Sequence, residues 1–436
     1  MGAPIRGLTR FLSVYGRPAG RARAENSSST TRYTADTGGA RPACGKIAEK
    51  NVEFGRSCVA KRGQRVAAAR KRRSSRQQQV TLPAIDALRD LPAFDDLRLD
   101  DAQRAAFDAF LGTAENADEM GLGFVVRLDR GYPLIVTADD VFRAEHSVSF
   151  AKQDAEKDEG LLPAVGDCVA VRRAPGHDMG VIERVLPRRT SFERWRGRNR
   201  GERQVLAANV DTILVVQPLG AGELLLGRVA RSLVLARDCG LTPVVVLTKA
   251  DRSSDEELTH EVERVRRLVG EDVRVIVTSS ATGAGVEDVR ACVPHGSCAM
   301  ILGESGAGKS TLLNALLGHE ALATGEVREK DDAGRHTTVA RVMVSLPGAG
   351  VIADVPGLRS LPLVGHERGL AKAFPEIAEA ALECRFNDCT HTHEPGCAVL
   401  SRFSEGDFCE ERLRGYLALA NEMRESARTL DPDVVI

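Results

Sequence analysis

The fold is decided by the stretch Gly303-Glu304-Ser305-Gly306-Ala307-Gly308-Lys309-Ser310-Thr311. It matches the pattern G-x-x-x-x-G-K-S and lies between an apolar run at 299–302 and a helical stretch that starts near Thr311. Glycines at these positions let backbone amides turn toward phosphate oxygens at the N-terminus of the helix. We expect Lys309 to reach the β- and γ-phosphates of a nucleotide, and the Ser310 hydroxyl to hold Mg²⁺.

Apolar runs on both sides of this loop predict the sheet that carries it. They are rich in Val, Ile and Leu and alternate with helical segments, which is typical of a mostly parallel sheet covered on both faces. The expected strands are 212–217, 243–248, 273–279, 299–302, 341–346 and 350–355. The sequence therefore predicts an α/β nucleotide-binding domain over residues 204–366.

A second motif, Thr248-Lys249-Ala250-Asp251, follows one of these strands and indicates which base is bound. Asp251 can accept hydrogen bonds from guanine N1 and N2, and the stem of Lys249 can cover the ring. GTP-binding proteins usually carry Asn where Thr248 stands, so one contact differs here. Ser279-Ser280-Ala281 ends the next strand, and we expect Ser280 and Ala281 to back the guanine.

A third motif, Asp354-Val355-Pro356-Gly357, ends a later strand. We expect Asp354 to bind Mg²⁺ through water and the Gly357 amide to sense the γ-phosphate. In ordinary GTPases the phosphate loop precedes the base-reading motif, whereas here Thr248 precedes Gly303. This order predicts a circularly permuted GTPase domain.

The segment Gly334-Arg335-His336-Thr337-Thr338 has the composition of a switch that senses GTP. We expect Thr338 to coordinate Mg²⁺ when GTP is bound. Leu358 stands where many GTPases carry the glutamine that orients the attacking water, and leucine cannot do so. His336 is therefore a candidate for that catalytic role beside Lys309 and Thr338, and a plain surface histidine is the alternative.

Cysteine and histidine residues gather near the C-terminus, in a stretch turned by Pro395-Gly396. The candidate ligands are Cys384, Cys389, His391 and Cys397, all within 14 positions. Three cysteines and one histidine can close a tetrahedral zinc site with no open position, and such a site is structural rather than catalytic. His393 could replace His391, and polar loop residues without a metal are the alternative. We expect a helical zinc-binding domain over residues 367–436.

The N-terminal half predicts a small barrel preceded by a helical segment. Short alternating strands within 121–187, at 123–128, 132–137, 165–171 and 180–185, indicate an OB-like β-barrel. Such barrels often bind nucleic acid, and a barrel without a ligand is the alternative. Residues 81–120 are expected to be helical and to pack on the next domain; their acidic residues are Asp95, Asp96, Asp100 and Asp101. A basic connector, 188–203, holds the one tryptophan and suits either RNA contacts or a solvated linker.

Charge is distributed unevenly along the chain. Residues 1–80 carry 18 Lys and Arg against 4 Asp and Glu, although the net charge of the whole chain is −1. This composition predicts a disordered extension that seeks a polyanion; a solvated extension, an over-long start or a targeting peptide are the alternatives. We expect a cytoplasmic protein with no membrane partner, because no apolar run approaches the roughly 20 residues of a membrane span and no secretion signal is evident.

Taken in order, these motifs resemble the ribosome small-subunit-dependent GTPase A family (RsgA, also called YjeQ). The resemblance covers about residues 121–436, whereas the basic first 80 residues and the Asp-rich stretch depart from the family pattern. It implies a monomeric late assembly factor that binds the small ribosomal subunit, and so its 16S rRNA, and hydrolyses GTP when docked. It also implies one structural Zn²⁺, and Mg²⁺ with GTP. By the same resemblance, the phosphates and Mg²⁺ are surrounded by Lys309, Ser310, Thr338 and Asp354, and guanine is read by Thr248, Lys249 and Asp251.

Two other classes of protein fit parts of this pattern. A phosphate-loop kinase or ATPase would prefer ATP and have no use for Asp251. A non-enzymatic, nucleotide-stabilised rRNA-binding scaffold would bind the subunit equally well with GTP and with GDP.

Overall fold

The structure is a computed structural model that describes residues 82–129, 132–147, 162–173, 176–196, 202–220, 224–321, 340–355, 363 and 365–430. The basic extension predicted for residues 1–80 lies outside these ranges, as do His336, Thr338 and Gly357. Residues Ala84–Ile436 form one unit, separate from Met1–Pro83. The description below concerns the unit Ala84–Ile436.

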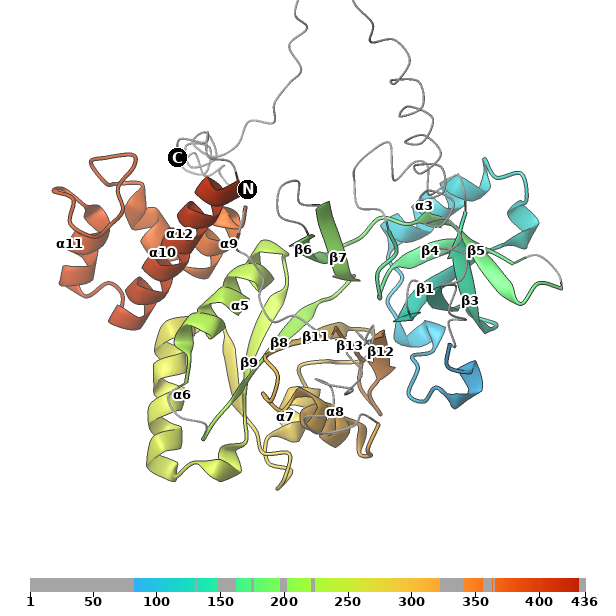
Figure 1. Cartoon of the computed structure of the whole chain (residues 1–436), viewed down its shortest axis with the longest axis horizontal. Coiled ribbons are helices and arrows are strands. Elements are labelled where there is room, and N and C mark those ends of the chain that lie inside the picture. Colours follow the sequence, from blue (N-terminus) through green and yellow to red (C-terminus); the bar gives the residue numbers. More distant parts are fainter. Residues whose placement is uncertain are drawn as a thin grey trace, which may run out of the picture. The chain divides into compact units, whose positions relative to one another are not determined.

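A closed barrel of five strands, with both antiparallel and parallel pairings, follows a short helical segment at the start of the described chain (Figure 1). Its first strand pairs with both the second and the fourth, and this double pairing closes the barrel. Alternate residues such as Val125, Ile135 and Val169 fill the interior. The strands are β1 (Met120–Asp129), β2 (Tyr132–Val136), β3 (Val141–His146), β4 (Cys168–Arg172) and β5 (Met179–Val185).

Strand β3 is absent from the sequence prediction, because charged residues interrupt its apolar pattern. Arg143 is one of them, yet it is buried and its guanidinium contacts the Asp129 carboxylate at 3.0 Å. A buried arginine is tolerated when it is paired in this way. The closed barrel itself confirms the predicted fold class.

The segment before the barrel holds one α-helix, α3 (Asp101–Leu111), with short 3-10 turns on either side. Asp100 caps this helix, since its carboxylate accepts from the Gln103 amide at 2.7 Å. The buried Gln103 side chain in turn donates to the Pro187 carbonyl at the end of the barrel, at 3.1 Å. The acidic residues of this segment thus include a structural cap. The 3-10 turns are η1 (Ile85–Ala87), η2 (Phe94–Asp96) and η3 (Ala117–Glu119).

A mostly parallel sheet follows, with the strand order β10-β9-β8-β11-β13-β12. The last of these strands, β12, is antiparallel to β13 and continues into the barrel by pairing with β1, in the register Arg127 to Val342. The boundaries lie close to those predicted from the apolar runs. The strands are β8 (Thr212–Pro218), β9 (Thr242–Thr248), β10 (Arg274–Val277), β11 (Cys298–Leu302), β12 (Arg341–Ser345) and β13 (Val351–Asp354).

Helices cover both faces of this sheet, as two separate hydrophobic clusters show. Val215 belongs to the cluster that includes α5 and α6, whereas its neighbour Val216 belongs to the cluster that includes α7 and α8. This alternation follows from the two-residue period of a strand, and it explains why the strands are apolar throughout. The helices are α5 (Leu226–Asp238), α6 (Asp255–Val269), α7 (Val286–Arg290) and α8 (Lys309–Leu317).

The basic segment 188–203 contributes to an antiparallel hairpin, and its residues 197–201 lie outside the described chain. The two strands of the hairpin are β6 (Ser191–Arg196) and β7 (Glu202–Ala208). Its first two arginines make internal ion pairs: Arg188 Nε lies 2.7 Å from Asp167, and Arg189 Nη1 lies 2.7 Å from Asp211. We therefore count these two side chains among the structural contacts rather than among free RNA-binding groups.

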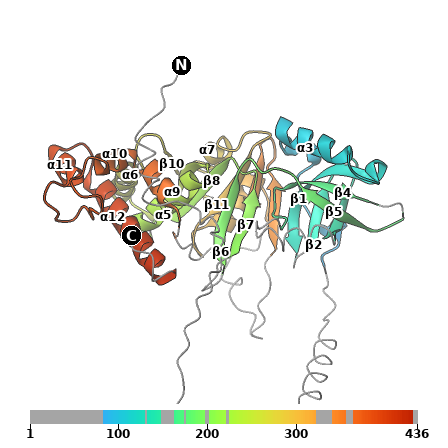
Figure 2. The same ribbon diagram turned by 90° about the horizontal axis from the view of Figure 1, so that it is seen from above.

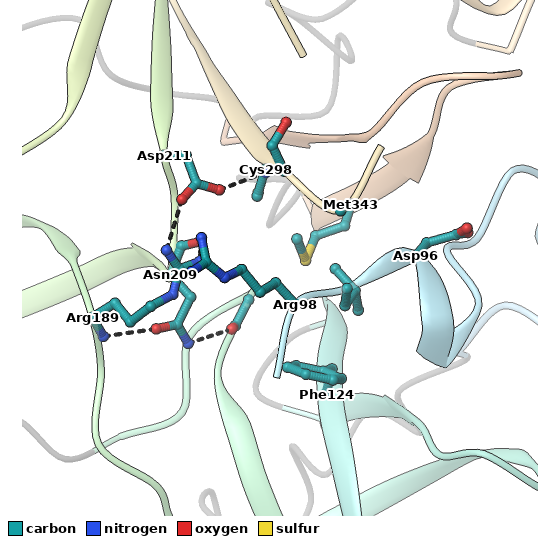
Figure 3. A pocket seen from close by; sticks show the side chains of 12 residues that line it. Asp96, Arg98, Phe124, Arg189, Asn209, Asp211, Cys298 and Met343 are labelled. Atoms are coloured by element: carbon teal, nitrogen blue, oxygen red, sulfur yellow. Dashed lines mark hydrogen bonds and ion pairs between the residues drawn. The ribbon is translucent and has the colours of Figure 1, made fainter. Parts of the chain in front are cut away.

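Arg189 lies in a small pocket where the segment before the barrel, the barrel and the sheet meet (Figure 3). It donates to the Asn209 carbonyl at 3.2 Å as well as to Asp211, and the Asp211 carboxylate accepts from the Cys298 amide at 2.9 Å. Asn209 in turn donates to the Gly166 carbonyl of the barrel at 2.8 Å. This chain of polar contacts joins the barrel to the starts of β8 and β11.

Four helices complete the described chain, and two of them, α9 and α12, pack against α5 and α6 (Figure 2). Arg231 of α5 is ion-paired with Glu422, and Arg412 donates to the Leu268 carbonyl at the end of α6, at 2.8 Å. Among the described residues, no helix combines the length and apolar character needed to cross a membrane. The helices are α9 (Glu367–Ala373), α10 (Pro375–Ala381), α11 (Ala398–Glu405) and α12 (Glu410–Leu430).

Candidate nucleotide-binding site and metal centre

The predicted nucleotide motifs meet at one edge of the parallel sheet. Strands β8, β9, β10, β11 and β13 all run in the same direction, so their C-terminal ends share that edge. The strand order reverses here, because β9 lies on one side of β8 and β11 on the other. Open α/β sheets bind ligands at such a switch point, in the crevice beyond the strand ends.

The phosphate loop leads from β11 into α8, as the sequence predicts. Gly303 has no room for a side chain, since a Cβ atom there would lie 2.6 Å from the Val216 carbonyl. Gly308 has φ +90° and caps the N-terminus of α8, a conformation that favours glycine. The Lys309 ammonium donates to the carbonyls of Gly303 and Glu304 at 2.7 and 2.6 Å, so it lies folded over the loop. Ser310 and Thr311 follow it in the first turn of α8.

The base-reading motif contacts the phosphate loop directly. Thr248 is buried at the end of β9, and its hydroxyl donates to the Ala307 carbonyl at 2.7 Å. Lys249 follows with φ +61°, and its ammonium donates to the Gly306 carbonyl at 2.7 Å. Two adjacent residues therefore hold the same loop from the side on which the guanine is expected.

Asp251 projects from the turn after β9 and is fixed by a serine from the next strand. The Ser279 hydroxyl donates to Asp251 Oδ1 at 2.6 Å. This hydrogen bond holds the pKa of the Asp251 carboxyl below its usual range. An exposed carboxylate that stays charged is suited to accept from guanine N1 and N2. Ser280 and Ala281 come directly after Ser279, at the same edge of the sheet.

Asp354 ends β13 and lies next to the start of the phosphate loop. Its register partner on β11 is Ile301, two residues before Gly303, and it is buried. Carboxylate and hydroxyl oxygens, such as those of Asp354 and Ser310, are ligands that Mg²⁺ prefers. The three remaining predicted residues, His336, Thr338 and Gly357, fall outside the described chain.

A second site lies among the C-terminal helices. The ligand atoms of Cys384, Cys389, His391 and Cys397 all lie within 4.8 Å of one another, and these residues could hold a metal ion. The two sulfurs of Cys384 and Cys397 are 3.9 Å apart, and His391 Nδ1 lies 3.5 and 3.6 Å from them. Two sulfurs bound tetrahedrally to one zinc ion at about 2.3 Å would be about 3.8 Å apart. The donor set and its spacing both fit zinc.

The structure distinguishes the two histidines that the sequence left as alternatives. His391 is buried, packs 6.1 Å from the Tyr416 ring between centroids, and turns Nδ1 toward the cysteines. His393 is exposed, and its Nδ1 lies 2.8 Å from the Thr392 hydroxyl. Burial lowers the pKa of His391, which favours the neutral ring that a metal requires.

Comparison with known proteins places these features in one family. The family model described as RsgA GTPase matches residues 185–364. Over 322 residues the chain is 45% identical to a Streptomyces coelicolor protein named small ribosomal subunit biogenesis GTPase RsgA, covering 74% of this chain and 84% of the relative. The chain belongs to the RsgA GTPase family. A protein of the same name from Methanosarcina acetivorans is 40% identical over 264 residues, which are 61% of this chain and 70% of that relative.

Solved structures of similar fold show the same architecture as this RsgA-family protein. YjeQ from Thermotoga maritima superimposes with a TM-score of 0.54 and 24% identity, covering 70% of this chain and 99% of that chain. YloQ, described as a circularly permuted GTPase, gives a TM-score of 0.50 and 20% identity, covering 72% and 98%. At this identity the likeness shows the fold alone. Family membership makes GTP hydrolysis the activity of this chain.

Two contacts at the site of this RsgA-family GTPase were missed by sequence reasoning. Ser279 was noted only as the start of the guanine-backing segment, whereas it is the residue that fixes Asp251. Arg228 of α5 was not singled out at all, yet it forms an ion pair with Glu304 of the phosphate loop. The position of Ser279 directly after a buried strand was a usable signal. No pattern in the sequence of α5 indicated that Arg228 pairs with Glu304.

Proposed function

We propose that this protein hydrolyses GTP to GDP and phosphate during late maturation of the small (30S) ribosomal subunit, in the cytoplasm and as a monomer. The observation that carries the proposal is the meeting of the base-reading motif and the phosphate loop, where Thr248 and Lys249 contact Ala307 and Gly306. Family membership adds the reaction, and the name of the relatives adds the small subunit.

In this proposal each residue at the sheet edge has a separate task. Asp251 selects guanine over adenine, because its carboxylate accepts from two donors that adenine does not present. Lys309 and the amides of the loop bind the phosphates. Ser310 and Asp354 would hold Mg²⁺, which neutralises charge on the phosphates when it is bound.

Activation of the attacking water is assigned to His336, and coordination of Mg²⁺ in the GTP state to Thr338. Support for this comes from the sequence alone: Leu358 replaces the usual glutamine, and a histidine stands in the switch segment. We infer slow turnover by the free protein and faster turnover on the subunit, where rRNA contacts would order the switch. If His336→Ala retained full subunit-stimulated hydrolysis, the assignment of water activation to His336 would be contradicted.

The four-residue cluster in the C-terminal helices is assigned one structural zinc ion. Its closed donor set leaves no position for substrate, so the ion would shape the module rather than take part in hydrolysis. The module lies against α5 and α6 and would contribute, together with the barrel, to binding of 16S rRNA.

The deciding experiment is GTP hydrolysis by the purified protein with and without small ribosomal subunits. ATP and large subunits serve as controls, and Lys309→Ala serves as the inactive variant. Stimulation confined to GTP and to the small subunit is expected. Equal stimulation by both subunits, or none, would contradict the ribosomal part of the proposal and favour a nucleotide-stabilised scaffold. A preference for ATP would contradict the guanine assignment.

A further inference from the structure

Glu304 is an acidic residue inside a loop that is built to bind phosphates. It is the second residue of the loop, and its own carbonyl accepts from the Lys309 ammonium at 2.6 Å. A carboxylate here has the same sign of charge as the phosphates of a nucleotide, so the two repel each other when a nucleotide is bound. A cation paired with this carboxylate would reduce the repulsion and strengthen phosphate binding.

Arg228 supplies such a cation from a different element. Its guanidinium Nη1 contacts Glu304 Oε2, and the two side chains are 47% and 43% exposed. The other two cations at the loop are already engaged with backbone carbonyls: Lys309 with Gly303 and Glu304, and Lys249 with Gly306. Arg228 thus pairs with the Glu304 carboxylate, whereas these two lysines bond to backbone carbonyls of the loop.

The backbone of Arg228 is held by hydrogen bonds in the first turns of α5. The Arg228 amide donates to the Leu225 carbonyl at 3.0 Å, and its own carbonyl accepts from the Ser232 hydroxyl at 2.9 Å. Further along the helix, Asp238 lies 2.7 Å from His366 Nδ1, so α5 is tied to the start of α9. An arginine on such a helix loses less conformational freedom when it pairs than one on a loop would.

We propose that Arg228 is a positioning residue of the nucleotide site, which neutralises Glu304 and thereby sets the affinity of the phosphate loop for the triphosphate. The inference rests on the proposed binding of GTP. It assigns Arg228 no contact with the nucleotide itself, because its effect passes through Glu304. GTP should depend on it more than GDP, since GTP brings an additional charged phosphate to the loop.

The test compares Arg228→Ala, Glu304→Gln and the double variant by the dissociation constants of fluorescent GTP and GDP analogues. Arg228→Ala is expected to weaken GTP binding about three- to tenfold, and GDP binding less. Glu304→Gln should bind at least as tightly as the wild type, and the double variant should recover its affinity. Arg228→Lys, which keeps the charge, should stay within about twofold of the wild type.

Arg237→Ala is the matched control, because Arg237 is ion-paired with Asp272 at the other end of the same helix. Wild-type affinity in Arg228→Ala would overturn the inference. A double variant as weak as Arg228→Ala would also overturn it, since the arginine would then act on the nucleotide directly. Melting temperatures identify misfolded variants, and Arg228→Gln repeats the test with a longer side chain. A wild type that does not bind GTP would contradict the proposed function instead.

Discussion

The hydroxyl of Thr248 donates to the carbonyl of Ala307 at 2.7 Å, and so connects the base-reading motif to the phosphate loop. Thr248→Val keeps the shape of the side chain and removes this donor. A buried carbonyl left without its partner costs about 1–3 kcal/mol. We expect GTP and GDP to bind roughly five- to a hundredfold more weakly, as measured by calorimetric titration.

Thr242→Val is the control for this prediction, because Thr242 is the exposed first residue of the same strand. Thr248→Ser retains the hydroxyl and should bind nucleotide nearly as well as the wild type. Unchanged affinity in Thr248→Val would show that the contact does not support the loop.

Asp251 gives a prediction about pH. The Ser279 hydroxyl lowers the pKa of Asp251, so the carboxylate stays charged as the pH falls, and guanine binding is lost only when the pH passes below this lowered pKa. Ser279→Ala should raise the pKa and move the acid limit of GDP binding to higher pH. The measurement is a series of dissociation constants between about pH 2.5 and 7.5.

Ser253→Ala serves as the comparison, since it removes a hydroxyl from the turn that carries Asp251 without removing the Ser279 contact. Circular dichroism at each pH separates loss of binding from loss of fold. An acid limit shared by the wild type and Ser279→Ala would count against this role of Ser279.

The sheet was predictable because burial on both faces requires apolar side chains at every position of its strands. The phosphate loop was predictable because glycine alone fits positions such as Gly303 and Gly308, so the constraint is written in the sequence. The metal cluster was predictable because three cysteines and a histidine within 14 positions are typical of a metal site.

Other features depend on tertiary pairing, which a single sequence does not display. Strand β3 carries Arg143, which reads as solvent-exposed until its partner Asp129 is known. The basic segment was interpreted as a connector because its arginines resemble RNA-binding groups, whereas Arg188 is committed to Asp167, 21 positions earlier. Burial of a charge is visible only when both partners are placed.

Arg188 and Asp167 give a prediction about stability. Both carboxylate oxygens of Asp167 accept from Arg188 at 2.7 Å, and the Asp167 side chain is fully buried. Arg188→Ala leaves this charge without its partner, and we expect the free energy of unfolding to fall by about 3–5 kcal/mol at neutral pH. Urea unfolding followed by circular dichroism measures it.

The loss of unfolding free energy in Arg188→Ala should become smaller as the pH falls. The direction of this change follows from the burial of Asp167. Burial raises the pKa of Asp167, so without Arg188 the folded protein takes up a proton more readily than the unfolded chain. Stability is then regained in acid and lost as the pH rises. Arg173→Ala, which breaks an exposed pair with Asp140, should change stability little. A defect of equal size at all pH values would contradict the account for Asp167.

The metal centre gives the last prediction. The purified protein should contain about one zinc ion per chain, and Cys397→Ser should lower that content and the melting temperature, because structural zinc contributes directly to folding. His391→Ala should have the same effect, whereas His393→Ala should keep its zinc, since His393 lies against Thr392 and outside the cluster. Elemental analysis and thermal unfolding before and after chelation measure both quantities. Zinc retained in His391→Ala but lost from His393→Ala would reverse the ligand assignment, because the exposed histidine would then complete the tetrahedron.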